Sequence, residues 1–183
     1  MTVKNLMLSD DYKLRLSGQL WIKLGHDLTR ESILECPDYH EKNLIVDIAS
    51  ELICSWAFQG LTPTIPGILT LAVGTGGIGW DLQNPPAESA SQTLLVSELA
   101  RKQFSDKTYV DNLGNPSVTR TNILDLTTTF LETEANGPLV EMGLFGGTGS
   151  TSANGGTMVN VKNFPVINKT SSMSAAILWR LTF

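Results

Sequence analysis

Strict alternation of apolar and polar residues marks the end of the chain and predicts a β-strand there. From Met173 to Phe183 every second residue is apolar, while Arg180 and Thr182 lie on the opposite face. This period of two is typical of a half-buried strand. Strands are also predicted in segments bounded by turn residues, at 68–73, 107–112, 118–131, 139–145 and 157–164.

The first part of the chain has mixed periods. Residues 12–27 alternate as a strand, with a break expected at Ser17-Gly18. A short helix is expected before Pro37, because the residue before proline disfavours helical geometry. Apolar residues then recur at three- and four-residue spacing from Asn43 to Gly60, which predicts an amphipathic helix with Asn43 as its N-cap. Segment 93–104 fits either a short helix or an extended strand.

Five or six strands separated by turns, with one amphipathic helix, predict an antiparallel β-sandwich or barrel on which the helix packs. We expect residues 1–42 to form an N-terminal strand and a polar connection of the same domain, and residues 43–183 to form the sandwich. A chain of 183 residues is long enough for one such domain.

Composition and charge limit the classes of molecule that the chain is expected to bind. The chain is 42% hydrophobic but only 17% charged, which indicates a surface partly covered by polar loops or neighbouring subunits. Thirteen basic residues stand against 18 acidic ones, and they are scattered, so neither nucleic acid nor a membrane is an expected partner. No signal peptide or membrane span is predicted, and two cysteines make no disulfide framework. Synthesis in a reducing cytosol is expected.

Gly74, Gly76 and Gly79 fall at the G-x-G-x-x-G spacing of a dinucleotide-binding turn. Such a turn needs a helix at its third glycine, so that amides point at the pyrophosphate. Pro85-Pro86 prevents a helix of useful length. We therefore interpret these glycines as the end of a core strand, and expect no binding of NAD or ATP.

The sequence gives little support for a nucleophilic, zinc-binding or glycosidase site. No G-x-S-x-G elbow accompanies the two histidines. His26, Cys36, His40 and Cys54 would supply four zinc ligands in number, but without knuckle spacing. No feature brings two of the scattered carboxylates together for glycosidase work; these are Asp81, Glu88, Glu98, Glu132, Glu134 and Glu141. We expect neither an enzyme nor a cofactor, metal or small-molecule substrate.

Five motifs occur in a particular order: "LAVGTGG", a proline-containing loop with "TLLVSELARKQF", "FLETEANGPLVEMGLFGG", "GTMVNVKNFPVINK" and "ILWRLTF". This order resembles a bacteriophage virion module found in tail-collar, fibre-type and related small structural proteins. The resemblance covers Asn43 to Phe183, although "GTGGIGW" departs from the commoner "GTGTTAP".

The resemblance implies a non-enzymatic structural subunit of a tailed phage, located in the tail, neck or baseplate. Its expected partners are copies of itself and other virion proteins, assembled in the host cytoplasm. We expect a stand-alone subunit rather than a complete host-recognition fibre. A capsid decoration protein is the alternative, and a carbohydrate-binding β-sandwich is a weaker one, for which Trp80 is the free aromatic candidate.

Two sets of residues follow as site predictions. The charged positions of the motifs are Glu98, Arg101 and Glu141, and we expect Arg101 to pair with Glu141 or Glu98; solvated surface charges are the competing interpretation. The expected assembly contacts lie in glycine- and proline-rich loops, at Pro63, Gly67, Gly74, Gly76, Gly79, Trp80, Pro85, Pro86, Gly146, Gly149 and Gly156. By composition, the loop 146–156 is predicted to be flexible.

Overall fold

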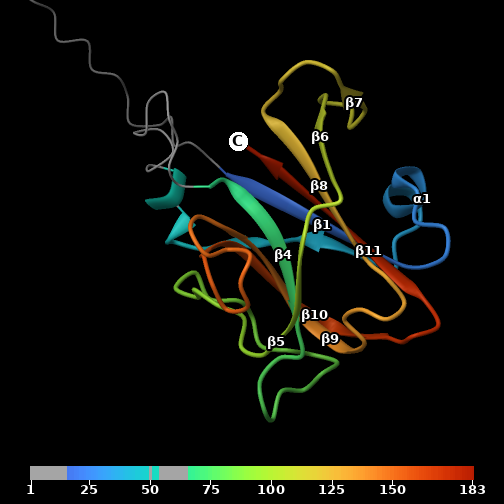
Figure 1. The fold of residues 1–183 in the computed structure, drawn as a ribbon, viewed down its shortest axis with the longest axis vertical. Coiled ribbons are helices and arrows are strands. Elements are labelled where there is room, and N and C mark those ends of the chain that lie inside the picture. Colours follow the sequence, from blue (N-terminus) through green and yellow to red (C-terminus); the bar gives the residue numbers. More distant parts are fainter. Residues whose placement is uncertain (1–15, 50, 54–65) are drawn as a thin grey trace, which may run out of the picture.

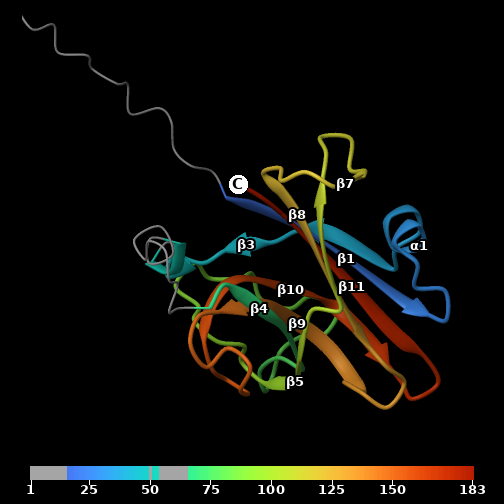
Figure 2. The ribbon, with the colours of Figure 1, turned by 45° about the horizontal axis from the view of Figure 1, so that its top comes forward.

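A computed structural model of the chain describes residues 16–49, 51–53 and 66–183. Two antiparallel sheets pack face to face over these residues, which confirms the predicted β-sandwich (Figures 1 and 2). The predicted contact residue Pro63 and the later part of the predicted amphipathic helix lie outside the described residues.

The first sheet has six strands in the order β2-β1-β11-β8-β6-β7. Their bounds are β1 Ser17–Gly25, β2 Tyr39–Lys42, β6 Asp106–Val110, β7 Pro116–Ser117, β8 Ile123–Phe130 and β11 Ser174–Thr182. β1 pairs with β11 without interruption from Ser17 to Gly25, so the predicted break at Ser17-Gly18 is wrong. The strand begins at Ser17 instead.

The second sheet has five strands in the order β3-β10-β9-β4-β5. Their bounds are β3 Leu44–Ile45, β4 Ile68–Gly74, β5 Glu98–Gln103, β9 Gly137–Gly146 and β10 Thr157–Lys169. Segment 93–104 is therefore extended where it forms β5, and the helical alternative is wrong. β5 pairs only with β4 among the described strands, which leaves it at the edge of the sheet.

The core lies between the two sheets. The alternation predicted for the last strand is confirmed, because Ala175, Ile177, Trp179 and Leu181 are all fully buried on the inner face of β11. The outer face is also covered locally. The helix α1 (Arg30–Glu35), which the sequence placed before Pro37, packs its Ile33 against Trp21 of β1 and Leu178 of β11. Thr29 caps α1 by accepting a hydrogen bond from the Ser32 amide.

The amphipathic helix does not begin at Asn43. Leu44 and Ile45 instead form β3 on β10, and the Val46 amide donates to the Val159 carbonyl at 3.2 Å. Residues 49 and 51–53 are helical, and Ala49 and Leu52 are buried in the core. The first apolar residues of the periodic run thus belong to a strand. Their pattern fits either a helix or a strand, and pairing with β10 decides for the strand.

Candidate functional site

The glycine-rich segment after β4 is held by one buried carboxylate. The side chain of Glu141, on β9, is fully buried and accepts three backbone hydrogen bonds. Its Oε1 accepts from the Gly76 and Ser97 amides at 3.1 and 2.8 Å, and its Oε2 accepts from the Val96 amide at 2.9 Å. The carboxylate thereby ties two loops that are far apart in sequence to the centre of the second sheet.

Glycine is required beside this carboxylate. A Cβ at Gly74 would lie 2.6 Å from both Glu141 Oε1 and the Ser97 carbonyl oxygen. Gly76 has a φ of +73°, and a Cβ there would lie 2.6 Å from the Trp80 ring. Trp80 is therefore packed against the backbone of its own loop rather than standing free, so it is a poor sugar platform.

This geometry differs from a dinucleotide-binding turn. β4 is antiparallel to both β5 and β9, and a turn rather than a helix follows Gly76. The Gly76 N–H, which would face a phosphate in such a turn, is already donated to Glu141. The glycines end a core strand, as the sequence analysis interprets them.

Arg101 holds a third loop. Its guanidinium makes two hydrogen bonds to the Glu98 carboxylate, at 2.9 and 2.7 Å, and both side chains are almost fully buried. It also donates to the carbonyls of Ser150 and Gly155, and its Cζ lies 3.9 Å from the centre of the Phe145 ring. The loop 146–156, predicted to be flexible, is thus fixed at two carbonyls by one arginine.

A β-bulge brings Glu98 and Arg101 to the same face of β5. Glu98 pairs with Gly74 and Ala100 pairs with Val73, so Leu99 is the extra residue. Of the two expected partners of Arg101, Glu98 is the one that it contacts. Glu141, the other expected partner, is buried, but its described hydrogen-bond partners are backbone amides and not a basic side chain.

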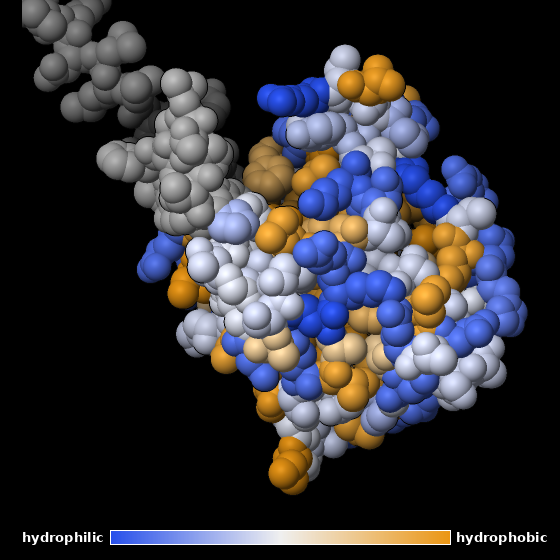
Figure 3. Space-filling model, viewed as in Figure 1, coloured by the Kyte–Doolittle hydropathy of each residue, from blue (hydrophilic) through white to orange (hydrophobic). Residues whose placement is uncertain are grey.

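Apolar side chains are exposed around these clamped loops. Ile78, at the tip of the loop that follows β4, is fully exposed, and Leu94, Val96 and Leu99 are each at least 40% exposed. This loop projects at the lower end of the view in Figure 1, where the surface of Figure 3 ends in an apolar tip. An exposed apolar group of this kind is a candidate for an interaction surface.

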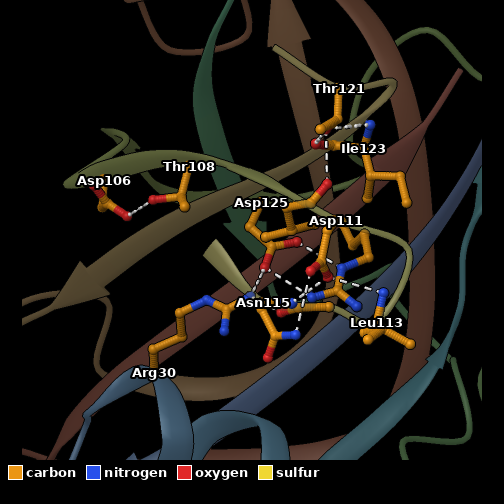
Figure 4. A network of polar contacts seen from close by, with 12 residues as sticks. Arg30, Asp106, Thr108, Asp111, Leu113, Asn115, Thr121, Ile123 and Asp125 are labelled. Atoms are coloured by element: carbon orange, nitrogen blue, oxygen red, sulfur yellow. Dashed lines mark hydrogen bonds and ion pairs between the residues drawn. The ribbon is translucent and has the colours of Figure 1, made fainter. Parts of the chain in front are cut away.

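A second polar network lies on the outer face of the first sheet (Figure 4). Asp125 of β8 is buried. Its carboxylate accepts two hydrogen bonds from Arg180, at 2.7 and 2.9 Å, and one from Arg30 of α1, at 2.6 Å. Arg30 also donates to the carbonyl of Gly114, in the turn between β6 and β7. Within that turn, Asp111 accepts from the amides of Leu113 and Asn115.

The β6–β7 hairpin and the segment after it carry another apolar tip. Leu113 is 87% exposed and Val118 is fully exposed. The hairpin projects at the upper end of Figure 1, opposite the loop that follows β4. The molecule therefore has two apolar tips at opposite ends, and each is supported by a buried carboxylate network.

The remaining predicted residues fall in two places. Gly67 and Gly146 adjoin, since the Gly147 amide donates to the Pro66 and Gly67 carbonyls, and Gly149 and Gly156 form the left-handed turns of the loop held by Arg101. Gly79 also has a positive φ. Pro85 and Pro86 instead line a separate open cleft beside Lys162. The sequence analysis missed Asp125 and Lys162, although a single charge inside an apolar strand is a usable signal for each.

His26, Cys36 and His40, three of the four residues considered as zinc ligands, form no metal site in the described part of the chain. His40 stacks on Trp21 with ring centres 4.3 Å apart, and Cys36 is exposed. Cys54 lies outside the described residues. Among the residues that the structure describes, no group of three His, Cys, Asp or Glu side chains is placed to hold a metal ion.

Comparison of the chain with models of known protein families and with curated protein sequences found no match. Within the described part of the chain, no helix has the length and apolar character to cross a bilayer.

Proposed function

We propose that this chain is a non-enzymatic structural subunit of a tailed bacteriophage particle, associated with the tail, neck or baseplate. The phage assignment rests on the ordered motifs of residues 43–183. The observation that carries the assembly role is the pair of exposed apolar tips at opposite ends of the sandwich, around Ile78 and around Leu113 and Val118.

Contacts at opposite ends suit an assembly of more than two copies. A twofold dimer uses one patch twice, whereas different patches at two ends make head-to-tail contacts, which close into rings when the rotation between copies closes and form filaments when it does not. Tail and neck components are rings of this kind in the architecture that the resemblance implies. Copies of the chain and other virion proteins are the partners in this proposal.

Both tips are preorganised for docking. Glu141 holds the base of the Ile78 loop, and Asp125 holds α1 and the hairpin turn through Arg30. A loop that is already ordered loses less conformational entropy when a neighbour binds. A contact element is expected to combine a rigid loop with exposed apolar side chains. In a loop that binds no partner, exposing Ile78 to water would bring no stabilisation.

A capsid decoration protein is the alternative within the same class. The number of copies in each particle distinguishes the two. Quantitative mass spectrometry of purified particles should give a few to a few dozen copies for a tail or neck subunit, and hundreds for a shell protein. Absence of the chain from the particles would overturn both.

Native mass spectrometry of the purified full chain tests the assembly role. Burying one isoleucine contributes about 1.5–3 kcal/mol, and every 1.4 kcal/mol is about tenfold in affinity. Ile78→Asp and Leu113→Asp should therefore each weaken association by at least about tenfold while leaving the melting temperature unchanged. Thr93→Asp, an exposed polar position, is the control. A wild-type chain that stays monomeric at high concentration would refute contacts between copies of the chain.

A further inference from the structure

An open cleft of about 590 Å³ lies at one edge of the sandwich, and none of the tip residues lines it. Its walls come from three segments: Tyr39 and Glu41 of β2, residues 83–88 of the proline-containing loop, and residues 162–165 on β10. Pro85, Pro86 and Pro165 contribute rigid apolar surfaces, and Gln83 and Asn84 contribute exposed amides.

Charged groups are fixed at the centre of the cleft. Lys162 Nζ lies 2.7 Å from Glu41 Oε2 and 3.3 Å from Glu88 Oε1. The Lys162 and Glu88 side chains are mostly buried, whereas Glu41 is 55% exposed. Glu88 is positioned in turn by the Asn163 amide, at 2.8 Å, and the Asn163 side chain donates to the Pro86 carbonyl. The proline-containing loop is thereby tied to β10.

Tyr39 supplies an oriented ring and hydroxyl. Its ring lies against the buried Phe164 with centres 5.4 Å apart, so its position is set by the core. Burial and the neighbouring Glu41 carboxylate raise the pKa of Tyr39, so the hydroxyl keeps its proton. The hydrogen bond from Lys162 lowers the pKa of Glu41, which stays ionised and accepting.

The charge balance selects the ligand class. Two carboxylates against one ammonium give the centre a net charge of about −1, which opposes phosphates, sulfates and carboxylates. A cationic ligand such as a lysine side chain has hydrogen-bond donors but no acceptor. It would therefore give no partner to the third N–H of Lys162 or to the side-chain amide N–H groups of Asn84 and Gln83. A hydroxyl both donates and accepts, so a polyhydroxylated ligand satisfies carboxylates, ammonium and amides together.

We propose that the cleft formed by Tyr39, Glu41, Glu88 and Lys162 binds a neutral saccharide. The apolar face of a sugar ring would lie on Tyr39 and the proline surfaces, and its hydroxyls would reach Glu41, Lys162 and Asn84. This follows the usual design of a small-ligand site, in which apolar walls supply contact and a few convergent polar groups set orientation. The inference does not depend on the assembly role, since it uses none of the tip residues.

A glycan array probed with the full chain tests the proposal, using neutral and sialylated oligosaccharides side by side. Calorimetry with the strongest neutral glycan then compares variants. Tyr39→Ala should weaken binding at least tenfold and Glu41→Gln several-fold, whereas Tyr109→Ala, a partly exposed tyrosine on the first sheet, should leave it unchanged. If Tyr39→Ala fails to fold, Asn84→Ala at an exposed loop position takes its place, with a loss of several-fold expected.

Three results would overturn the site. They are no retention of any neutral glycan by the folded wild-type chain, retention of anionic glycans alone, and affinity for the neutral glycan that is unchanged in both Glu41→Gln and the Tyr39 or Asn84 variant. Binding of a lysine-rich peptide in place of glycans would show that the excess negative charge, and not the mixed donors and acceptors, determines recognition.

Discussion

Replacing Glu141 by glutamine isolates the contribution of the carboxylate that anchors the glycine loop. The two side chains have nearly the same shape, so packing changes little. The glutamine oxygen can still accept from Gly76 and Ser97, but its NH2 group then faces the Val96 N–H, which sits 2.9 Å from the present Oε2. One acceptor is lost and two donors are left opposed.

The magnitude follows from hydrogen-bond energetics. A hydrogen bond to a charged group contributes about 1.5–3 kcal/mol, and a buried donor without a partner costs about 1–3 kcal/mol. We expect Glu141→Gln to lower the free energy of unfolding by about 2–4 kcal/mol. Glu141→Ala, which leaves three amides without their acceptor, should cost more. Near this chain length, roughly 2–4 °C of melting temperature accompanies each kcal/mol.

Urea denaturation measures the loss, and amide hydrogen exchange locates it. Exchange should accelerate at Val96 in Glu141→Gln and at Gly76, Val96 and Ser97 in Glu141→Ala. Glu132→Gln, at an exposed position, is the matched control and should change stability by less than about 0.5 kcal/mol. A Glu141→Gln protein as stable as wild type, with unchanged exchange at Val96, would refute the reasoning.

Three further predictions concern Arg101, Gly76 and the Lys102–Glu134 ion pair. Arg101→Ala leaves Glu98 buried without its partner, so it should lower stability by about 3–5 kcal/mol and the melting temperature by roughly 10 °C, whereas the exposed Arg120→Ala should not; an unchanged melting curve would contradict this. Gly76→Ala should destabilise more than Gly79→Ala by about 1–3 kcal/mol and shift tryptophan fluorescence to the red, because both have positive φ but only a Cβ at residue 76 meets Trp80; equal effects would disprove it. The hydrogen bond from Lys102 lowers the pKa of Glu134 from 4.5, so the folded state binds fewer protons than the unfolded state, and stability should fall as pH drops from 4.5 through the lower folded value; Glu134→Gln should flatten acid denaturation there, and an identical pH slope would contradict the assignment.

Local patterns were sufficient for most of the fold. The last strand follows from its unbroken alternation, and the end of α1 follows from Pro37, because neighbouring residues carry this information. Leu44 and Ile45 show the limit of such patterns. Two apolar residues at the start of a helical repeat can equally pair with a strand, and β10, more than 100 residues away in the chain, decides the outcome.

The sequence indicated several residues of the candidate site but not the contacts between them. The glycines at 74 and 76 were interpreted correctly as a strand end. Nothing in the sequence links them to Glu141, however, because that contact joins amides and a carboxylate 44 to 65 residues apart. The partner of Arg101 was named without the bulge at Leu99 that makes it possible. The Tyr39–Lys162 cleft joins three distant segments, and no local pattern predicts it.

A cryo-EM map of the particle that contains this chain would show directly whether the two apolar tips make assembly contacts. We expect a ring or a regular array of sandwich-shaped subunits, with both Ile78 and the Leu113–Val118 tip buried against neighbouring copies or other virion proteins. A particle without the chain, or one in which both tips face solvent, would contradict it.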